Sequence, residues 1–303
     1  MIRVQKQEVD VIGVQMDLGA SKRGVSMGPM AIRYGGLVEG LERLGYQVND
    51  LGDIIPMPKG KTQDNMRNYE QVINVNQRLY RSVSQTLEKG KVPVVLGGDH
   101  SIVAGSISAV SKYYGDKGGI GIIWIDAHGD WNNEKSTLSG NMHGMPFSAV
   151  CGHGPQCMVD YGQNPAYVDV KHCVQIGGRD IDPEERQRMK EAGVTVFPIN
   201  VVDKLGMDEV IRQAIEIAGN GTAGIHLSFD VDAITPEAAP GTGTVVHSGL
   251  TVREAFLAVE TLAETGKVLA VDMVEVNPIL DEHNKTGILA SELVQSALGK
   301  IVY

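Results

Sequence analysis

The sequence predicts an α/β fold in which a central, mostly parallel sheet is covered by helices on both faces. Short apolar, β-branched runs alternate along the chain with longer segments of helical periodicity, as expected for parallel sheets. The runs are nearly continuous in apolar residues, which is typical of strands buried on both sides. No Pro-rich or Ser-rich linker and no repeat divides the 303 residues. We therefore expect a single domain over residues 1–303.

Eight strands are predicted. Six come from clear apolar runs such as "VPVVL" and "IGIIWID", and two shorter ones come from weaker runs. The clear strands are expected at 9–15, 92–96, 120–126, 172–177, 223–230 and 268–275, and the shorter ones near 46–50 and 194–198. Apolar positions spaced three and four apart predict the helices. These are expected near 28–44, 67–88, 100–114, 183–192, 206–218, 251–264 and 285–299.

The segment "GNGTAG" at 219–224 matches the glycine spacing of a dinucleotide-binding loop. Such a loop must follow a strand and open a helix. Here the glycines follow a predicted helix and precede a predicted strand. We therefore interpret them as a helix stop and a tight turn.

Charge and cysteine content limit the class of protein. The chain has 27 Lys and Arg against 37 Asp and Glu, giving a net charge of −10, which argues against nucleic-acid and anionic-membrane partners. No apolar run reaches the roughly 18 residues that a membrane span needs. Three cysteines without a CxxC pair are typical of reduced thiols. We expect a cytoplasmic protein, in which a negative cleft would attract a cationic small molecule.

The loops after four predicted strands carry unusual polar clusters: "GGDHS", "HGDWN", "VDAITPEAAPGTGT" and "VNPILDE". In open α/β sheets, ligands bind beyond the carboxyl ends of the strands. Four clusters at the same edge of the sheet indicate one shared site.

Two of these clusters place carboxylates at alternate positions. Asp126, His128 and Asp130 follow the run "IIWI", and Asp230 and Asp232 follow "HLSF". On extended backbone, alternate side chains share one face. Carboxylates gathered there would repel one another unless a positive charge lay among them.

With His100 of "GGDHS", the clusters contain four carboxylates and two imidazoles. Two divalent cations would neutralise the four negative charges. Oxygen-rich ligands with a minority of imidazoles suit Mn²⁺. Two such ions can share a bridging water and turn it into a hydroxide nucleophile. A single Asp or His after a strand is more often a helix cap or turn residue, so the hypothesis rests on the combination.

The motifs resemble the ureohydrolase superfamily and, within it, the arginase family. The resemblance extends over nearly the whole chain, and the segments "SGNMHGMP" and "EVNP" favour arginase over agmatinase. It implies a single three-layer α/β/α domain and a homo-oligomer, either trimer or hexamer. It also implies hydrolysis of L-arginine to L-ornithine and urea, by attack of a metal-bridging hydroxide.

The resemblance further implies how two Mn²⁺ ions are held. One ion would take His100, Asp126, Asp130 and Asp230, and the other would take His128, Asp126, Asp230 and Asp232. Asp126 and Asp230 would bridge the two ions.

Catalytic roles are implied for three residues. Glu275 would pair with the guanidinium group of the substrate. Asp130 would pass a proton to the departing amine, and His143 of "SGNMHG" matches a mobile histidine proposed as a proton shuttle. The alternatives are a surface carboxylate for Glu275 and a structural loop histidine for His143.

Recognition of the amino-acid end would fall to polar groups in two loops. Amides and a hydroxyl can donate to an α-carboxylate, and carboxylates can hold an α-ammonium. The residues that match are Asn132, Ser139, Asn141, Asp182 and Glu185, with Thr244 near the guanidinium. Asn and Ser are also ordinary turn formers, and Asp182 precedes a proline as helix-starting residues do.

Two other functions remain open. Another ureohydrolase, such as agmatinase, would use the same metals on a guanidine without an α-carboxylate. A non-catalytic arginine-binding protein would keep the fold but not the turnover. For His226, both a role behind the metal ligands and a place in the core are open, whereas Trp131 is expected to pack away from the ligands.

Overall fold

A computed structural model of the protein describes residues 7–58, 60–161 and 164–301. Its eight strands form one sheet in the order β2-β1-β3-β8-β7-β4-β5-β6, and every pair is parallel. The strands are β1 (Glu8–Val14), β2 (Gln47–Ile54), β3 (Val92–Leu96), β4 (Gly121–Ile125), β5 (Cys173–Ile176), β6 (Thr195–Phe197), β7 (Ile225–Asp230) and β8 (Val268–Val274). All eight predicted strands are confirmed; β3 has the predicted bounds, and the other seven have shifted ends.

The helices correspond to the predicted segments, with one division. They are α1 (Gly28–Tyr34), α2 (Leu37–Arg43), α3 (Tyr69–Glu88), α4 (Val103–Tyr114), α5 (Pro146–Val150), α6 (Pro183–Ala192), α7 (Ile199–Leu205), α8 (Met207–Gly219), α9 (Val252–Glu264) and α10 (Lys285–Ala297). The helix expected at 28–44 is two helices, because Gly36 adopts a left-handed conformation with φ of 82°. The short helices α5 and α7 were not predicted.

The predicted turn at "GNGTAG" is also confirmed. Helix α8 ends at Gly219, Gly221 has a φ of 73°, and β7 begins at Ile225. In the described part of the chain, no helix has the length and apolar character needed to cross a bilayer.

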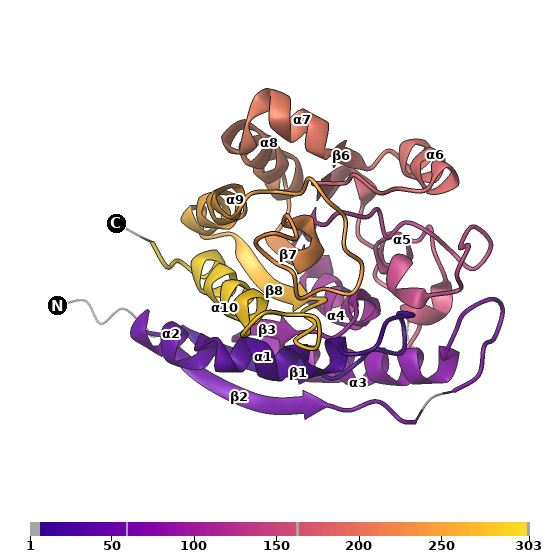
Figure 1. The fold of residues 1–303 in the computed structure, drawn as a ribbon, viewed down its shortest axis with the longest axis horizontal. Helices are drawn as coiled ribbons and strands as arrows, with labels where there is room; N and C mark the ends of the chain where they lie inside the picture. Colours follow the sequence, from indigo (N-terminus) through magenta and orange to yellow (C-terminus); the bar gives the residue numbers. More distant parts are fainter. Residues whose placement is uncertain (1–6, 59, 162–163, 302–303) are drawn as a thin grey trace.

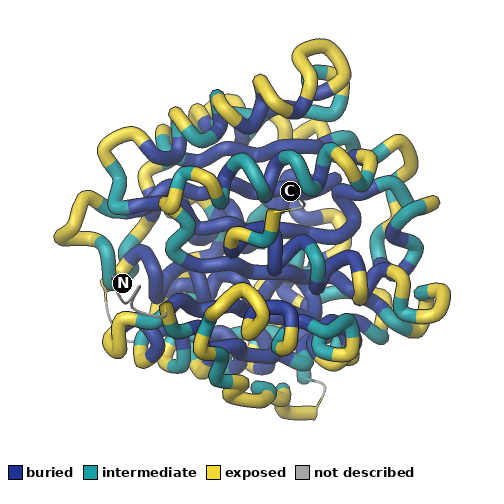
Figure 2. The backbone as a smooth tube through the Cα atoms, turned by 90° about the vertical axis from the view of Figure 1, so that its left-hand side faces the viewer, coloured by how far each residue is buried: buried dark blue, intermediate teal, exposed yellow. Residues whose placement is uncertain are grey.

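The sheet separates two apolar cores, because successive strand side chains point to opposite faces. Ile123 and Ile125 of β4 belong to the core that also contains residues of α1, α2 and α7 to α10, whereas Ile122 and Trp124 belong to the core that contains residues of α3, α4 and α5. The helical layers can be followed in Figure 1, and Figure 2 shows the buried strands inside a shell of exposed loops and helix turns. This arrangement confirms the predicted three-layer α/β/α fold.

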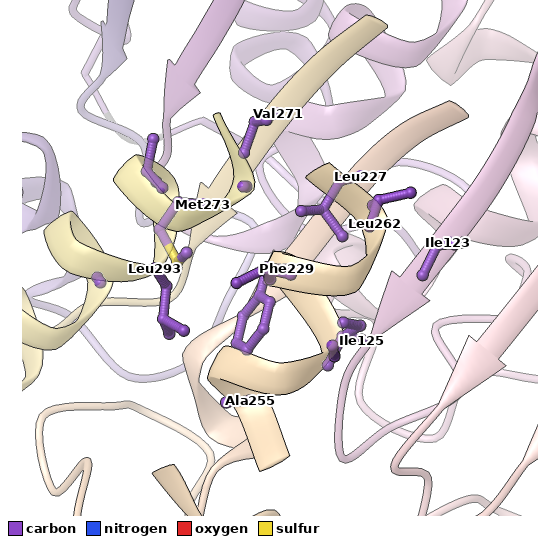
Figure 3. Packing of buried hydrophobic residues seen from close by; sticks show 14 of the residues in the cluster. Ile123, Ile125, Leu227, Phe229, Ala255, Leu262, Val271, Met273 and Leu293 are labelled. Atoms are coloured by element: carbon purple, nitrogen blue, oxygen red, sulfur yellow. The ribbon is translucent and has the colours of Figure 1, made fainter. Parts of the chain in front are cut away.

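Phe229 of β7 lies at the centre of one core and is fully buried. Figure 3 shows its ring between Ile125 of β4 and Leu293 of α10, above Ala255 of α9. This packing fixes the end of β7, whose last residue is Asp230, just before the polar loop that follows.

The strand order brings the four polar loops together. Strands β3, β8, β7 and β4 are neighbours in the sheet although they are far apart in the sequence. All run parallel, so their carboxyl ends meet at one edge. The loops that begin after Leu96, Ile125, Asp230 and Val274 therefore face one another.

Replacing Leu293, which is fully buried, with alanine should leave a cavity beside Phe229. We expect Leu293→Ala to lower the free energy of unfolding by about 2–5 kcal/mol, measured by urea denaturation of the metal-free protein. Leu138, which is 88% exposed, supplies the matched control. Equal losses for Leu293→Ala and Leu138→Ala would contradict this account of the core.

Candidate metal centre and active site

Three carboxylates surround His100, and they come from the ends of two strands, β4 and β7. His100 opens a short 3-10 turn after β3, and Asp99 caps that turn by accepting the Ser101 N–H. The His100 Nδ1 atom lies 3.0 Å from an oxygen of Asp126, 3.0 Å from one of Asp130 and 3.2 Å from one of Asp230. Nδ1 is buried, and no hydrogen-bond partner for it occurs among the described residues. Such an atom, facing three carboxylates, is suited to a cation.

His128 forms a second group beside the first. Its Nδ1 lies 3.0 Å from Oδ2 of Asp232 and 3.3 Å from Oδ1 of Asp126. Asp126 therefore faces His128 with one oxygen and His100 with the other. In each of two sets, His100 with Asp126 and Asp130, and His128 with Asp126 and Asp232, the possible ligand atoms lie within 4.8 Å of one another.

The backbone brings these groups together in a way that we did not expect. The prediction of extended backbone through Asp130 is wrong, because β4 ends at Ile125 and Asp130 has a left-handed φ of 47°. Residues 231–233 likewise form a 3-10 turn. These turns are held by the carboxylates themselves, since Asp126 accepts the His128 N–H at 2.7 Å and Asp230 accepts the Asp232 N–H at 2.8 Å.

The charges in this cluster are unbalanced without a cation. Burial and the neighbouring Asp126 carboxylate raise the pKa of Asp130 to about 6. Burial, with Asp232 and Asp126 nearby, raises the pKa of Asp230 well above its ordinary value. Ionising several of these carboxylates at once is unfavourable, because they are buried and close enough to repel one another. The unbonded Nδ1 of His100 and this excess of carboxylate fit a pair of divalent cations.

Buried groups behind the ligands hold them in place. Trp124 stacks on the His100 ring at a centroid distance of 4.2 Å, and its indole N–H donates to Oδ2 of Asp126 at 3.0 Å. Ser228 lies 2.9 Å from the other ring nitrogen of His100. Partners of this kind fix the orientation of a metal ligand.

Sequence reasoning missed two further supports, Gln175 and Arg179. The Gln175 amide donates to the carbonyls of Asp126 and His128, both at 3.0 Å. The Arg179 guanidinium donates to the carbonyls of Asp232 and Val246, both at 2.7 Å. An amide inside the apolar strand "CVQI" was an available signal for Gln175. Arg179 gave no such signal, because its partners are backbone carbonyls far away in the sequence.

A cavity of about 180 Å³ opens over this cluster. It is lined by His128, Asp130, Asn132, Ser139, His143, Gly144, Asp180, Asp182, Glu185, Asp230 and Thr244. Nine of these were candidates from the sequence, whereas Gly144 and Asp180 were not. Two other candidates lie just behind the lining. Asn141 donates its N–H to Ser139 at 3.1 Å, and Glu275 contacts His143.

His143 and Glu275 form a buried pair. Oε1 of Glu275, which is 1% exposed, lies 2.9 Å from Nδ1 of His143 and also accepts the His100 N–H at 2.9 Å. Burial lowers the pKa of His143, but Glu275 outweighs this effect and raises it to about 9. This shift favours the protonated form of the His143 imidazole.

Three other candidates, Glu185, Asp182 and Thr244, form hydrogen bonds with other residues of the protein. Glu185 accepts the N–H groups of Trp131 at 2.7 Å and Asp182 at 3.3 Å, and burial raises its pKa to about 8. Asp182 caps α6 as well as lining the cavity. Thr244 donates to Oδ2 of Asp232 at 2.9 Å.

The two remaining residues lie in the cores. His226 is fully buried, with Nε2 2.7 Å from Oδ2 of Asp272 on β8, so it belongs to the core. Trp131 is buried against Phe147, with ring centroids 4.9 Å apart, which confirms its packing role.

Imidazoles and carboxylates gathered at the carboxyl edge of a parallel α/β sheet are typical of a metal-dependent hydrolase. Residues 7–299 match the family model described as the arginase family. The chain belongs to the arginase family. It is therefore a hydrolase with arginase-type ureohydrolase activity, and the family implies a binuclear metal site.

Known proteins support this assignment along the whole chain. Arginase from Bacillus caldovelox is 43% identical over 299 residues, covering 96% of this chain and 98% of that protein. Its structure gives a TM-score of 0.94 at 42% identity, covering 98% and 100% of the two chains.

Structures with lower sequence identity to this chain also share its fold, with lower TM-scores. Entamoeba histolytica arginase in complex with L-ornithine has a TM-score of 0.90 at 33% identity, covering 98% and 100%. A hypothetical agmatinase from Burkholderia thailandensis has a TM-score of 0.73 at 27% identity, covering 96% and 84%.

Asp126 faces both imidazoles, so its loss should affect both cations. We expect Asp126→Asn to weaken divalent-metal retention by more than the roughly 10–100-fold cost of losing an outer partner. Metal content per chain, measured by mass spectrometry after dialysis, tests this. The control is Asp208→Asn, at an exposed ion pair on α8. Full metal content in Asp126→Asn would refute the assignment.

Proposed function

We propose that the protein hydrolyses L-arginine to L-ornithine and urea, using two Mn²⁺ ions. The observation that carries this proposal is the pair of imidazole and carboxylate groups that share Asp126 beneath a cavity lined by polar side chains. The residues that would hold the ions are His100, Asp126, His128, Asp130, Asp230 and Asp232. Carboxylate oxygens outnumber imidazoles among them, which suits Mn²⁺.

When bound, two such ions would supply Lewis-acid activation of a water nucleophile near neutral pH. In the overall reaction, the water oxygen bonds to the guanidinium carbon and the bond from that carbon to Nε breaks. The departing amine needs a proton. Asp130, which lines the cavity, would take the proton released by the attacking water and pass it to the departing amine. His143 also lines the cavity, with a pKa raised to about 9, and would act as the proton shuttle.

The carboxylates of the cavity suit a cationic substrate. Oε1 of Glu275 is occupied by His143 and by the His100 N–H. Among the described residues, no hydrogen bond engages its Oε2. This second oxygen is the atom that we expect to pair with the guanidinium through a charge-assisted contact.

The outer part of the cavity suits an amino acid. Asn132 and Ser139 line it, and Asn141 lies directly behind Ser139. These groups would donate to an α-carboxylate, while Asp182 would accept from an α-ammonium. The Entamoeba histolytica relative binds L-ornithine, and the higher identity to arginases than to the agmatinase supports L-arginine as substrate.

The proposal has three further parts. We propose that the chain forms a homo-oligomer, either trimer or hexamer, that it is located in the cytoplasm, and that residues 1–303 form a single domain. These parts rest on the family resemblance and the chain's composition. Analytical ultracentrifugation would test the subunit number.

The direct test is urea release after Mn²⁺ loading, with L-arginine and agmatine measured in parallel. We expect strong preference for L-arginine. Preference for agmatine would retain the chemistry but overturn the roles of Asn132, Ser139 and Asp182. If the protein binds metal but releases urea from neither compound, the result would indicate a non-catalytic protein or an enzyme that acts on a different amidine substrate.

Glu275→Gln keeps the shape of the side chain but removes its charge. It should lower kcat/KM for L-arginine by about 10²–10⁴-fold, because both the guanidinium contact and the proton of His143 depend on that charge. Urea release under saturating Mn²⁺ measures the effect. Glu282→Gln, exposed in the same loop, should change little. An unchanged rate in Glu275→Gln would remove Glu275 from the catalytic groups.

A further inference from the structure

The side-chain amide of Asn141 has a fixed orientation. Its Oδ1 accepts from the Ser21 hydroxyl at 3.0 Å and lies 3.4 Å from Nη1 of Arg67. Arginine has only donors, so the atom that faces Arg67 must be the amide oxygen. Arg67 also donates to the Ser21 hydroxyl at 3.0 Å. The Asn141 NH₂ group is therefore turned away from these two partners.

Ser139 is oriented by the same loop. Its hydroxyl oxygen accepts the Asn141 N–H at 3.1 Å, which leaves the hydroxyl hydrogen free to donate. Ser139 lines the cavity. The site thus presents a hydroxyl donor at Ser139 and an amide donor two residues later, at Asn141. Among the described residues, no hydrogen bond engages either donor as a donor, which favours a ligand that carries an anionic group.

The segment that carries Arg67 is bound to the loop of residues 132–141 by one backbone hydrogen bond and by the side-chain amide of Asn65. The Arg67 N–H donates to the Gly140 carbonyl at 2.9 Å, and the Asn65 amide donates to the carbonyls of Glu134 and Thr137 at 3.1 and 3.3 Å. Gly140 has a φ of 73°, and a Cβ there would lie 2.7 Å from the Asn65 carbonyl oxygen. This close approach holds Arg67 in a defined position relative to Asn141.

Arg67 also differs from its charged neighbour Arg23. The two line the same outer cavity of about 360 Å³. Arg23 is paired with Asp17 at 2.9 Å. Within the described residues, no Asp or Glu lies within ion-pair distance of Arg67. Its positive charge is therefore available to a ligand in a chain whose net charge is −10.

We propose that Arg67 is a specificity-determining residue of this enzyme, which acts through Ser21 and Asn141 to favour substrates that carry an α-carboxylate. By holding the amide oxygen of Asn141, Arg67 keeps the NH₂ group in a donating orientation, and its charge adds attraction for an anion. The amine formed by decarboxylation lacks the group that this arrangement recognises. The proposal rests on the function proposed above and names the part of the chain that selects the amino acid.

The test compares Arg67→Gln and Arg67→Lys with the wild type under saturating Mn²⁺. Urea release gives KM and kcat for L-arginine. Agmatine is measured as a competitive inhibitor of that reaction, so that slow turnover does not matter. We expect Arg67→Gln to raise KM for L-arginine by about tenfold or more, with little change in kcat or in the agmatine inhibition constant. Arg67→Lys keeps the charge but loses the planar guanidinium group, so its KM for L-arginine should lie between those of the wild type and Arg67→Gln.

Arg23→Gln is the matched control, because it removes a charge from the same outer cavity while leaving Asn141 untouched. Arg23→Gln should change neither KM for L-arginine nor the inhibition constant of agmatine. Equal weakening of L-arginine and agmatine in Arg67→Gln, or no change in either, would overturn the role of Arg67. If the wild type releases no urea from L-arginine, the proposed function fails first, and the selectivity proposal fails with it.

Discussion

The repulsion among four buried carboxylates is the constraint on which the active site depends. Asp126, Asp130, Asp230 and Asp232 lie close together with little water around them, where like charges are costly. Two imidazoles, the indole N–H of Trp124 and several backbone N–H groups partly offset this cost. The negative charge that remains on the carboxylates makes the site suited to binding cations.

The fold makes this costly arrangement tolerable. The ligand candidates follow three parallel strands, β3, β4 and β7, at one edge of the sheet, and β8 lies between β3 and β7. Apolar packing on both faces of the sheet prevents the strand ends from separating to relieve the repulsion. Gln175 and Arg179 add restraint from outside, because they bind the carbonyls of the ligand turns rather than the ligands. Stability of the sheet and affinity for metal are therefore coupled in this chain.

The sequence was enough to predict the strands and the side chains that gather at their ends, since apolar runs and the polar residues after them are local signals. It was not enough for the conformation of the ligand turns, because Asp130 and residues 231–233 depart from extended backbone under hydrogen bonds that the carboxylates themselves make. Arg179 and Arg67 also gave no signal. Their partners lie about 50 to 75 residues away, and only the folded chain brings these atoms together.

The aromatic residues of the site have a consequence for how the protein can be observed. The chain contains two tryptophans, Trp124 and Trp131. Trp124 stacks on His100 and on Phe147, and Trp131 meets Phe147 edge-on. Of the two indoles, only that of Trp124 therefore contacts the proposed metal ligands, whereas Trp131 lies on the far side of Phe147. Because the fluorescence of Trp124 depends on the charges beside its ring, binding of cations at the proposed site would change the emission of this one residue.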